Sequence, residues 1–295
     1  METLYLVADE SGAKQRAIKG EQYPGELGVM AGLLFIGGKF ARVEGRLNSV
    51  VTSYVGSSPK LHITDLTPGA QSSLRADIFA ILKDESVTCV YEAISSHGFH
   101  KADSDIRQLE EESKQEARSS VSVSGKYPID RLHRQLFEGL YAKTVAYGLE
   151  KLGGVFEIKA IIDHVDEALL REFRETTADF LGRIDTTTDV SGFDHNTRKV
   201  VYGKIDFRAT GLDDLSQVTS SVAIGGGSLV LAADVLANSL LHHLEGRPIM
   251  ERPNRPAATE GHPLQELFYG TSDNDISDAL FGVAESLEND EGEDA

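Results

Sequence analysis

The chain has 295 residues, of which 40% are hydrophobic and 26% charged, a length and composition that suit one large or two small globular domains with a proper core. Its net charge of −18, from 29 basic and 47 acidic residues, argues against indiscriminate nucleic-acid binding, which depends on Lys and Arg neutralising phosphates. The single cysteine, Cys89, excludes an internal disulfide, and no run reaches the about 20 apolar residues of a membrane span, so we expect a cytoplasmic protein with no membrane association.

The first third of the chain predicts three strands and two helices. Apolar runs that end at polar or glycine residues predict strands at 4–8 and 28–36, and a short connection makes them an antiparallel pair. Apolar residues at helical spacing predict helices at about 39–55 and 71–83. The apolar run at 87–94 predicts a third strand, in which Cys89 is a buried structural thiol.

The rest of the chain predicts alternating helices and strands after a polar insertion at about 95–127. The helices are expected at 128–152, 166–181 and 229–244, and the strands at 155–162 and 200–207. After residue 246 come three prolines and an acidic tail, so we expect residues 247–295 to be irregular. Strands mixed with helices after an antiparallel start predict one layered α/β or α+β domain over residues 1–246.

The first predicted strand ends in two consecutive carboxylates, in the sequence Ala8-Asp9-Glu10-Ser11-Gly12. Asp, Ser and Gly also favour turns, so a strand that runs into a polar turn is one interpretation. The other is that Asp9 binds a divalent metal ion, because hard cations such as Mg²⁺ take carboxylate oxygens as ligands. A buried carboxylate costs several kcal/mol unless it is paired or bound to a metal.

Two further acids interrupt apolar sequence. Asp163 follows Ile161 and Ile162 and precedes a predicted helix, which Asp166 is better placed to cap. Asp234 lies within the helix predicted at 229–244, with apolar neighbours on every side. An unpaired acid there would be destabilising, so we expect Asp234 to have a cationic partner, either a basic side chain or a metal ion.

His62 and Asp65 alternate with apolar residues, as in a half-buried strand. Histidine is the usual general acid or base near neutral pH, but it is also an ordinary surface residue, and the two interpretations are balanced here. A hydrolase that uses Ser11 or His62 as its nucleophile lacks the expected elbow pattern.

A strand ending in Asp-Glu-Ser-Gly, a later strand ending in Asp and a final helix reading Leu-Ala-Ala-Asp-Val-Leu-Ala-Asn together resemble the microbial family catalogued as domain of unknown function number 3800, of ribonuclease-H-like type. The resemblance covers most of residues 1–246 and implies an α/β fold with a mixed sheet flanked by helices. It implies that Asp9, Asp163 and Asp234 bind Mg²⁺ or Mn²⁺, that Glu10 assists them, and that His62 belongs to the catalytic set. The chain departs from the family at Leu231, where glutamine is common, and in the residues before His62.

The implied chemistry is phosphodiester hydrolysis by a two-metal mechanism, with DNA or RNA as substrate. Asp65 or Glu44 could supply a fourth carboxylate. A basic face could come from six residues of the early region, namely Lys14, Arg16, Lys19, Lys39, Arg42 and Lys60. The alternative hypothesis is a non-catalytic binding protein with a degraded site. Convergence of Asp9, Asp163 and Asp234 in the fold would favour the nuclease.

Overall fold

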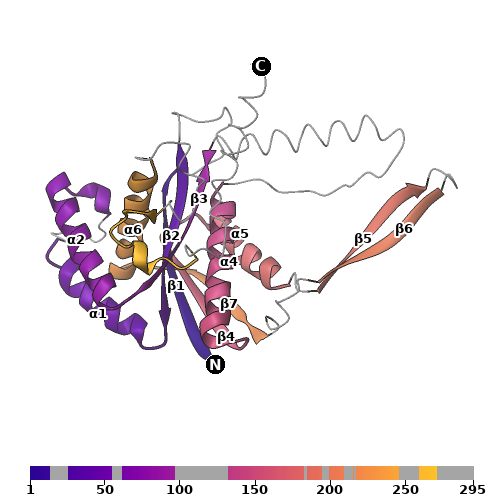
Figure 1. Ribbon diagram of the computed structural model, residues 1–295, viewed down its shortest axis with the longest axis horizontal. Helices are drawn as coiled ribbons and strands as arrows, with labels where there is room; N and C mark the ends of the chain where they lie inside the picture. The colour runs from indigo at the N-terminus through magenta and orange to yellow at the C-terminus, as the bar shows by residue number, and fades with distance from the viewer. Residues whose placement is uncertain are drawn as a thin grey trace, which may run out of the picture.

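A five-stranded mixed sheet forms the centre of the protein, in the strand order β3-β2-β1-β4-β7 (Figure 1). Its strands are β1 (Glu2–Gly12), β2 (Leu27–Ile36), β3 (Thr88–Ser95), β4 (Phe156–Ile162) and β7 (Thr219–Ile224). β2 pairs antiparallel with β1 and β3, whereas β4 pairs parallel with β1 and β7. The structure, a computed structural model, describes residues 1–13, 26–54, 62–96, 132–182, 185–194, 199–208, 215, 217–245 and 259–270, with backbone alone for 185–194 and 199–208.

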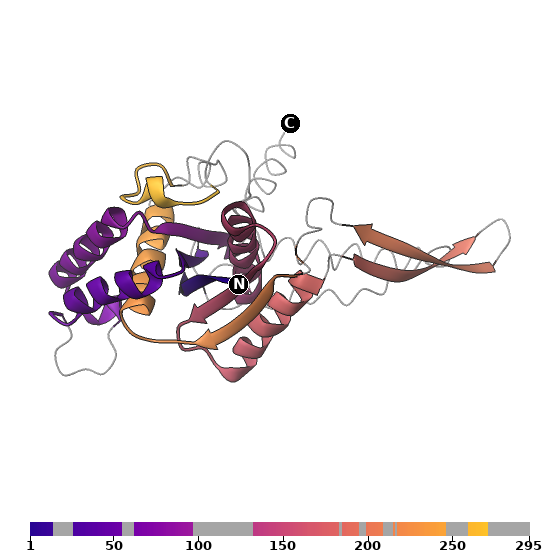
Figure 2. The same cartoon turned by 90° about the horizontal axis from the view of Figure 1, so that it is seen from below.

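Helices cover both faces of this sheet (Figures 1 and 2). One face carries α1 (Lys39–Val51), α2 (Pro68–Asp84) and α6 (Ser228–Glu245), and the other carries α4 (Leu132–Leu152) and α5 (Glu167–Gly182). None of the described helices is both long and apolar enough to cross a membrane.

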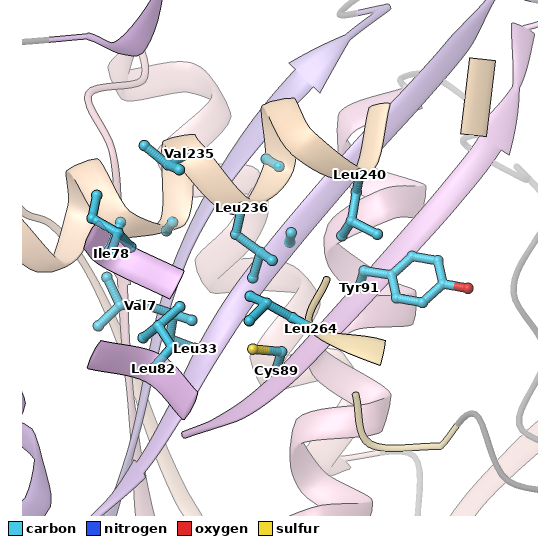
Figure 3. Packing of buried hydrophobic residues seen from close by; sticks show 14 of the residues in the cluster. Val7, Leu33, Ile78, Leu82, Cys89, Tyr91, Val235, Leu236, Leu240 and Leu264 are labelled. Atoms are coloured by element: carbon cyan, nitrogen blue, oxygen red, sulfur yellow. The ribbon is translucent and has the colours of Figure 1, made fainter. Parts of the chain in front are cut away.

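The larger part of the core lies between the sheet and α6. Val7 of β1 and Leu33 of β2 are fully buried there, and Cys89 of β3 lies beside them with its thiol inaccessible to solvent, as predicted (Figure 3). α6 contributes the largest share from the helices, with Leu236 directed towards these strands. Because successive strand residues face opposite sides, Leu4, Leu6 and Ala8 pack in the second core, beneath α4 and α5.

A short C-terminal segment, residues 259–270, packs on the domain and contains the 3₁₀ turn Gln265–Leu267. Tyr269 donates its backbone N–H to the carbonyl of Cys89 over 2.8 Å, so the segment covers the outer edge of β3. His262 is buried against α6, with Nε2 3.1 Å from Oγ of Ser239. The segment follows the point at which the sequence predicts the end of the domain, and it nevertheless contributes Leu264 to the main core.

The fold class predicted from the sequence is confirmed: the protein is α/β, with a mixed sheet flanked by helices and an antiparallel start, consistent with a ribonuclease-H-like arrangement. The predicted helices and strands in the described regions are present, with ends shifted by a few residues. The strand expected around His62 and Asp65 is wrong, because Ile63–Asp65 forms the 3₁₀ turn η1. The sequence interpretation also missed two strands, β5 (Asp185–Asp194) and β7. Most of the predicted insertion and of the acidic tail lies outside the described residues.

β5 pairs antiparallel with β6 (Lys199–Arg208) in a separate two-stranded sheet. Both overall views show this hairpin projecting away from the five-stranded sheet and its helices (Figures 1 and 2). It contains the strand predicted at 200–207.

Candidate metal centre

Asp9 and Asp163 come to the same end and the same face of the sheet. Ala8 and Ile162 are partners in the parallel register of β1 and β4, and Asp163 donates its backbone N–H to the carbonyl of Ala8 over 3.3 Å. Val7 and Ile161, two residues earlier in each strand, pack in the α6-side core. Because strand residues alternate between faces, Asp9 and Asp163 follow on that α6 side.

Asp234 approaches this end of the sheet from α6. Its side chain is 15% exposed, and its Oδ2 accepts the backbone N–H of Ile63 over 3.0 Å. The same oxygen lies 3.7 Å from Nδ1 of His62. The sequence predicted a cationic partner for Asp234; the structure gives one carboxylate oxygen a backbone donor and a neighbouring imidazole, so a partner can be supplied without any Lys or Arg.

The strongest electrostatic signature of the site is at Asp9, which is 6% exposed. Burial, followed by the negative charges of Glu10, Asp234 and Asp163, raises the pKa of Asp9 to about 8. A hydrogen bond from the backbone N–H of Glu10 to Oδ1 of Asp9, at 2.8 Å, favours the ionised form but only partly offsets these effects. Asp9 is therefore mainly protonated at neutral pH in the metal-free protein, and the fold brings the charges of all three predicted ligands to bear on one another.

Glu10 follows Asp9 in the chain but belongs to the opposite face of the sheet. Its Oε1 lies 3.9 Å from Nε2 of His133, a residue of α4, which covers that face. Alternation along β1 explains this separation, since Leu6 and Ala8 lie on the same side as Glu10. Glu10 therefore influences Asp9 through its charge and its backbone N–H, while its side chain is directed towards α4.

His62 lies at the edge of the site rather than within it. Its side chain is 41% exposed, beside Asp234. Asp65, a candidate for a fourth carboxylate, accepts the backbone N–H of His62 at Oδ2 over 3.0 Å, so its carboxylate closes the η1 turn. The contact between Ile63 and Asp234 then joins this turn to α6.

The residues fit a divalent cation in donor type and in charge, because several hard oxygen donors gather where the protein itself leaves a carboxylate protonated. They do not form a closed cage. Among the residues that the structure describes, no three carboxylate, imidazole or thiol groups are placed so that they could hold one metal ion together. Ligation by Asp9, Asp163 and Asp234 would therefore require adjustment of their side chains.

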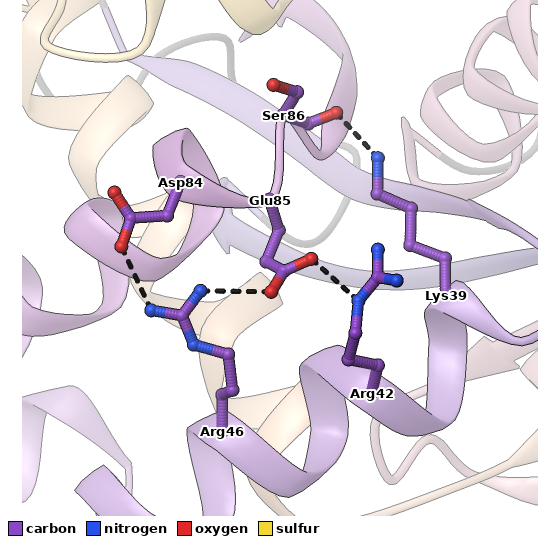
Figure 4. Close-up of polar contacts among 6 residues, drawn as sticks. All are labelled: Lys39, Arg42, Arg46, Asp84, Glu85 and Ser86. Carbon is purple, nitrogen blue, oxygen red and sulfur yellow. Dashed lines mark hydrogen bonds and ion pairs between the residues drawn. The ribbon is translucent and has the colours of Figure 1, made fainter.

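The basic face predicted from the early region receives no support from its described members. Lys39 donates to the carbonyl of Ser86 over 2.8 Å, and Arg42 donates to Glu85 over 2.8 Å (Figure 4). Together with Arg46, which bonds Asp84 and Glu85, these side chains connect α1 to the C-terminal end of α2. Lys14, Arg16, Lys19 and Lys60 lie outside the described residues.

No protein-family model and no curated protein matches this chain. The resemblance based on the short acidic motifs therefore stays a prediction. The sequence interpretation could not have found the Ile63 contact, because a backbone N–H carries no residue-type signal. The opposite placement of Glu10 could have been inferred from the alternation of apolar residues in β1.

Proposed function

We propose that this protein is a metal-dependent nuclease of ribonuclease-H-like type, which hydrolyses phosphodiester bonds. The observation that carries the proposal is the raised pKa of Asp9, caused by burial and by the carboxylates of Glu10, Asp234 and Asp163. Clustered acids of this kind are costly to a fold and are characteristic of functional sites. A divalent cation would offset the repulsion and would make the ionised form of Asp9 favourable.

Asp9, Asp163 and Asp234 are the residues that would hold Mg²⁺ or Mn²⁺. When bound, such ions supply a nucleophilic water and stabilise the leaving oxygen of a phosphodiester. The chain's own contribution is positional. β1 and β4 bring Asp9 and Asp163 to one sheet end, and the N–H of Ile63 orients Asp234 on α6. His62, half exposed beside Asp234, is placed to exchange a proton with a substrate at the edge of the site.

A second candidate function is non-catalytic binding on the same fold, with a degraded active site. Two observations favour it: the absence of a three-ligand group among the described side chains, and the backbone hydrogen bond that already occupies Oδ2 of Asp234. In that case the acids would be structural, and divalent cations would leave the stability of the protein unchanged.

The test combines cleavage with stability. The wild-type chain is incubated with Mg²⁺, Mn²⁺ or EDTA and a panel of single-stranded and double-stranded DNA, RNA and hybrids, with Asp9→Asn as the matched variant. Melting temperatures are measured under the same conditions. We expect metal-dependent cleavage and a rise in melting temperature with metal, both lost in Asp9→Asn. A metal-induced rise without cleavage would support a binding protein, and neither effect would contradict the metal centre itself.

A further inference from the structure

The hairpin of β5 and β6 has two faces of very different composition. In its register, Asp185 pairs with Arg208 and Asp189 with Lys204, which places these charges on one face. The register positions between them form the second face. It comprises Thr186, Thr188, Val190, Gly192, Asp194, Lys199, Val201, Gly203, Ile205 and Phe207. We call this second set the apolar face, since its one charged pair, Asp194 with Lys199, lies at the tip.

A two-stranded hairpin on its own is marginally stable in water at best, and an apolar face makes that instability greater. The hairpin projects away from the domain in both overall views, and the strands β5 and β6 form a sheet that is separate from the central one (Figures 1 and 2). We propose that a second copy of this chain covers the apolar face, so that two hairpins pack face to face in a homodimer.

The register of the hairpin makes the apolar face complementary to itself. A two-fold rotation about an axis along the hairpin exchanges β5 and β6, so each residue meets the register partner of its own position in the other copy. Val190 then meets the partner's Gly203, and Gly192 meets the partner's Val201. Likewise, Thr188 meets the partner's Ile205, and Thr186 meets the partner's Phe207. Every large residue is matched with a smaller one, as close packing of two sheets requires.

The charges obey the same symmetry. At the tip, Asp194 meets the partner's Lys199, and Lys199 meets the partner's Asp194. The two strands together carry four acids and three bases, a net charge of −1, in a chain whose net charge is −18. The hairpin is therefore a part of this acidic protein where two copies can approach with little repulsion.

The experiment measures self-association of the full chain by sedimentation equilibrium, with a monomer mass of 32.0 kDa. We expect wild type to form a dimer, and Asp194→Lys or Lys199→Asp to weaken the dimer by about tenfold or more, because like charges then meet at both tips. An equimolar mixture of the two variants should regain the wild-type affinity, since each chain supplies the charge that the other lacks. Asp189→Lys, which makes the same change of charge on the other face, serves as control and should dimerise as wild type does.

Restoration by mixing separates the proposed contact from effects within one hairpin, because each variant keeps its own damaged Asp194–Lys199 pair in the mixture. Thermal melts of all variants check that the domain itself is intact. A monomeric wild type would overturn the proposal, whether the hairpin is then protected from proteolysis by its own chain or is cleaved. A dimer that is unaffected by both tip variants, or one that mixing fails to restore, would overturn it as well.

Discussion

Ile63 donates its backbone N–H to Oδ2 of Asp234 over 3.0 Å, and this single contact joins the η1 turn to the helix that carries the proposed ligand. Ile63 is fully buried, so no solvent is available to replace its acceptor. The carboxylate of Asp234 thus has a structural role in the metal-free protein, in addition to its charge.

This dual role predicts that Asp234→Ala and Asp234→Asn differ. Both variants remove the repulsion between Asp234 and Asp9, but only Asn retains an oxygen that can accept the N–H of Ile63. We expect the Ala variant to be less stable than the Asn variant by about 1–3 kcal/mol, the cost of an unsatisfied buried donor. Urea denaturation in EDTA measures the difference. Equal stabilities would mean that the contact contributes nothing.

The raised pKa of Asp9 predicts a distinct pH dependence of stability. In the unfolded chain its pKa is near 3.8, and in the fold it is about 8, so the folded state binds the proton more tightly. This stabilisation is fully present below about pH 4 and is lost as the pH rises to 8, with an upper limit of about 6 kcal/mol. Asp9→Asn removes this loss and keeps an acceptor for the N–H of Glu10. The variant should gain stability relative to wild type between pH 5 and about 8 in EDTA; parallel curves would be the contrary result.

The same pKa predicts that binding of a divalent cation releases a proton. At pH 7 Asp9 is mainly protonated, and a carboxylate must be ionised to act as a ligand. Calorimetric titration with Mn²⁺ in two buffers of different ionisation enthalpy should give about one proton released per chain at pH 7 and almost none well above pH 8. Metal binding without linked proton release would place the ion away from Asp9.

Some of this site is legible in the sequence and some is not. Asp9 and Asp163 end apolar runs, and a parallel pairing of their strands is enough to bring them together. β7 escaped prediction because Thr219–Ile224 is an edge strand whose residues are mostly polar or exposed, so it lacks the apolar signal of a buried strand. The segment around His62 alternates as a strand would, but the carboxylate of Asp65 closes a local turn instead.

Lys143 and Glu92 form a buried ion pair between α4 and β3, with Nζ 2.9 Å from Oε2 and also 2.7 Å from the carbonyl of Tyr91. Removing one partner leaves a buried charge without compensation, so Glu92→Gln should cost about 3–5 kcal/mol. Glu175→Gln breaks an exposed pair with Arg171 and should cost less than about 1 kcal/mol. Chemical denaturation compares the two variants, and similar costs would refute the importance of burial at Glu92.

His262 holds the C-terminal segment on α6 as a neutral imidazole. Its Nδ1 lies 3.1 Å from the backbone nitrogen of Leu264, which donates to it, and its Nε2 lies 3.1 Å from Oγ of Ser239. Burial, together with the positive charges of His243, Arg75 and Lys83, lowers the pKa of His262 to about 4. A depressed histidine pKa gives stability that is complete above pH 6.5 and is lost as the pH falls towards 4.

The loss between pH 6.5 and 4 should therefore reach about 3 kcal/mol in wild type. His262→Gln retains polar atoms at this position but cannot titrate, so its stability should vary less over the same interval. Denaturation curves at several pH values measure the two slopes, and proteolysis after residue 245 reports release of the segment. If both proteins lose stability equally between pH 6.5 and 4, the acid sensitivity arises elsewhere, because a buried neutral imidazole cannot then be the group that must take up a proton.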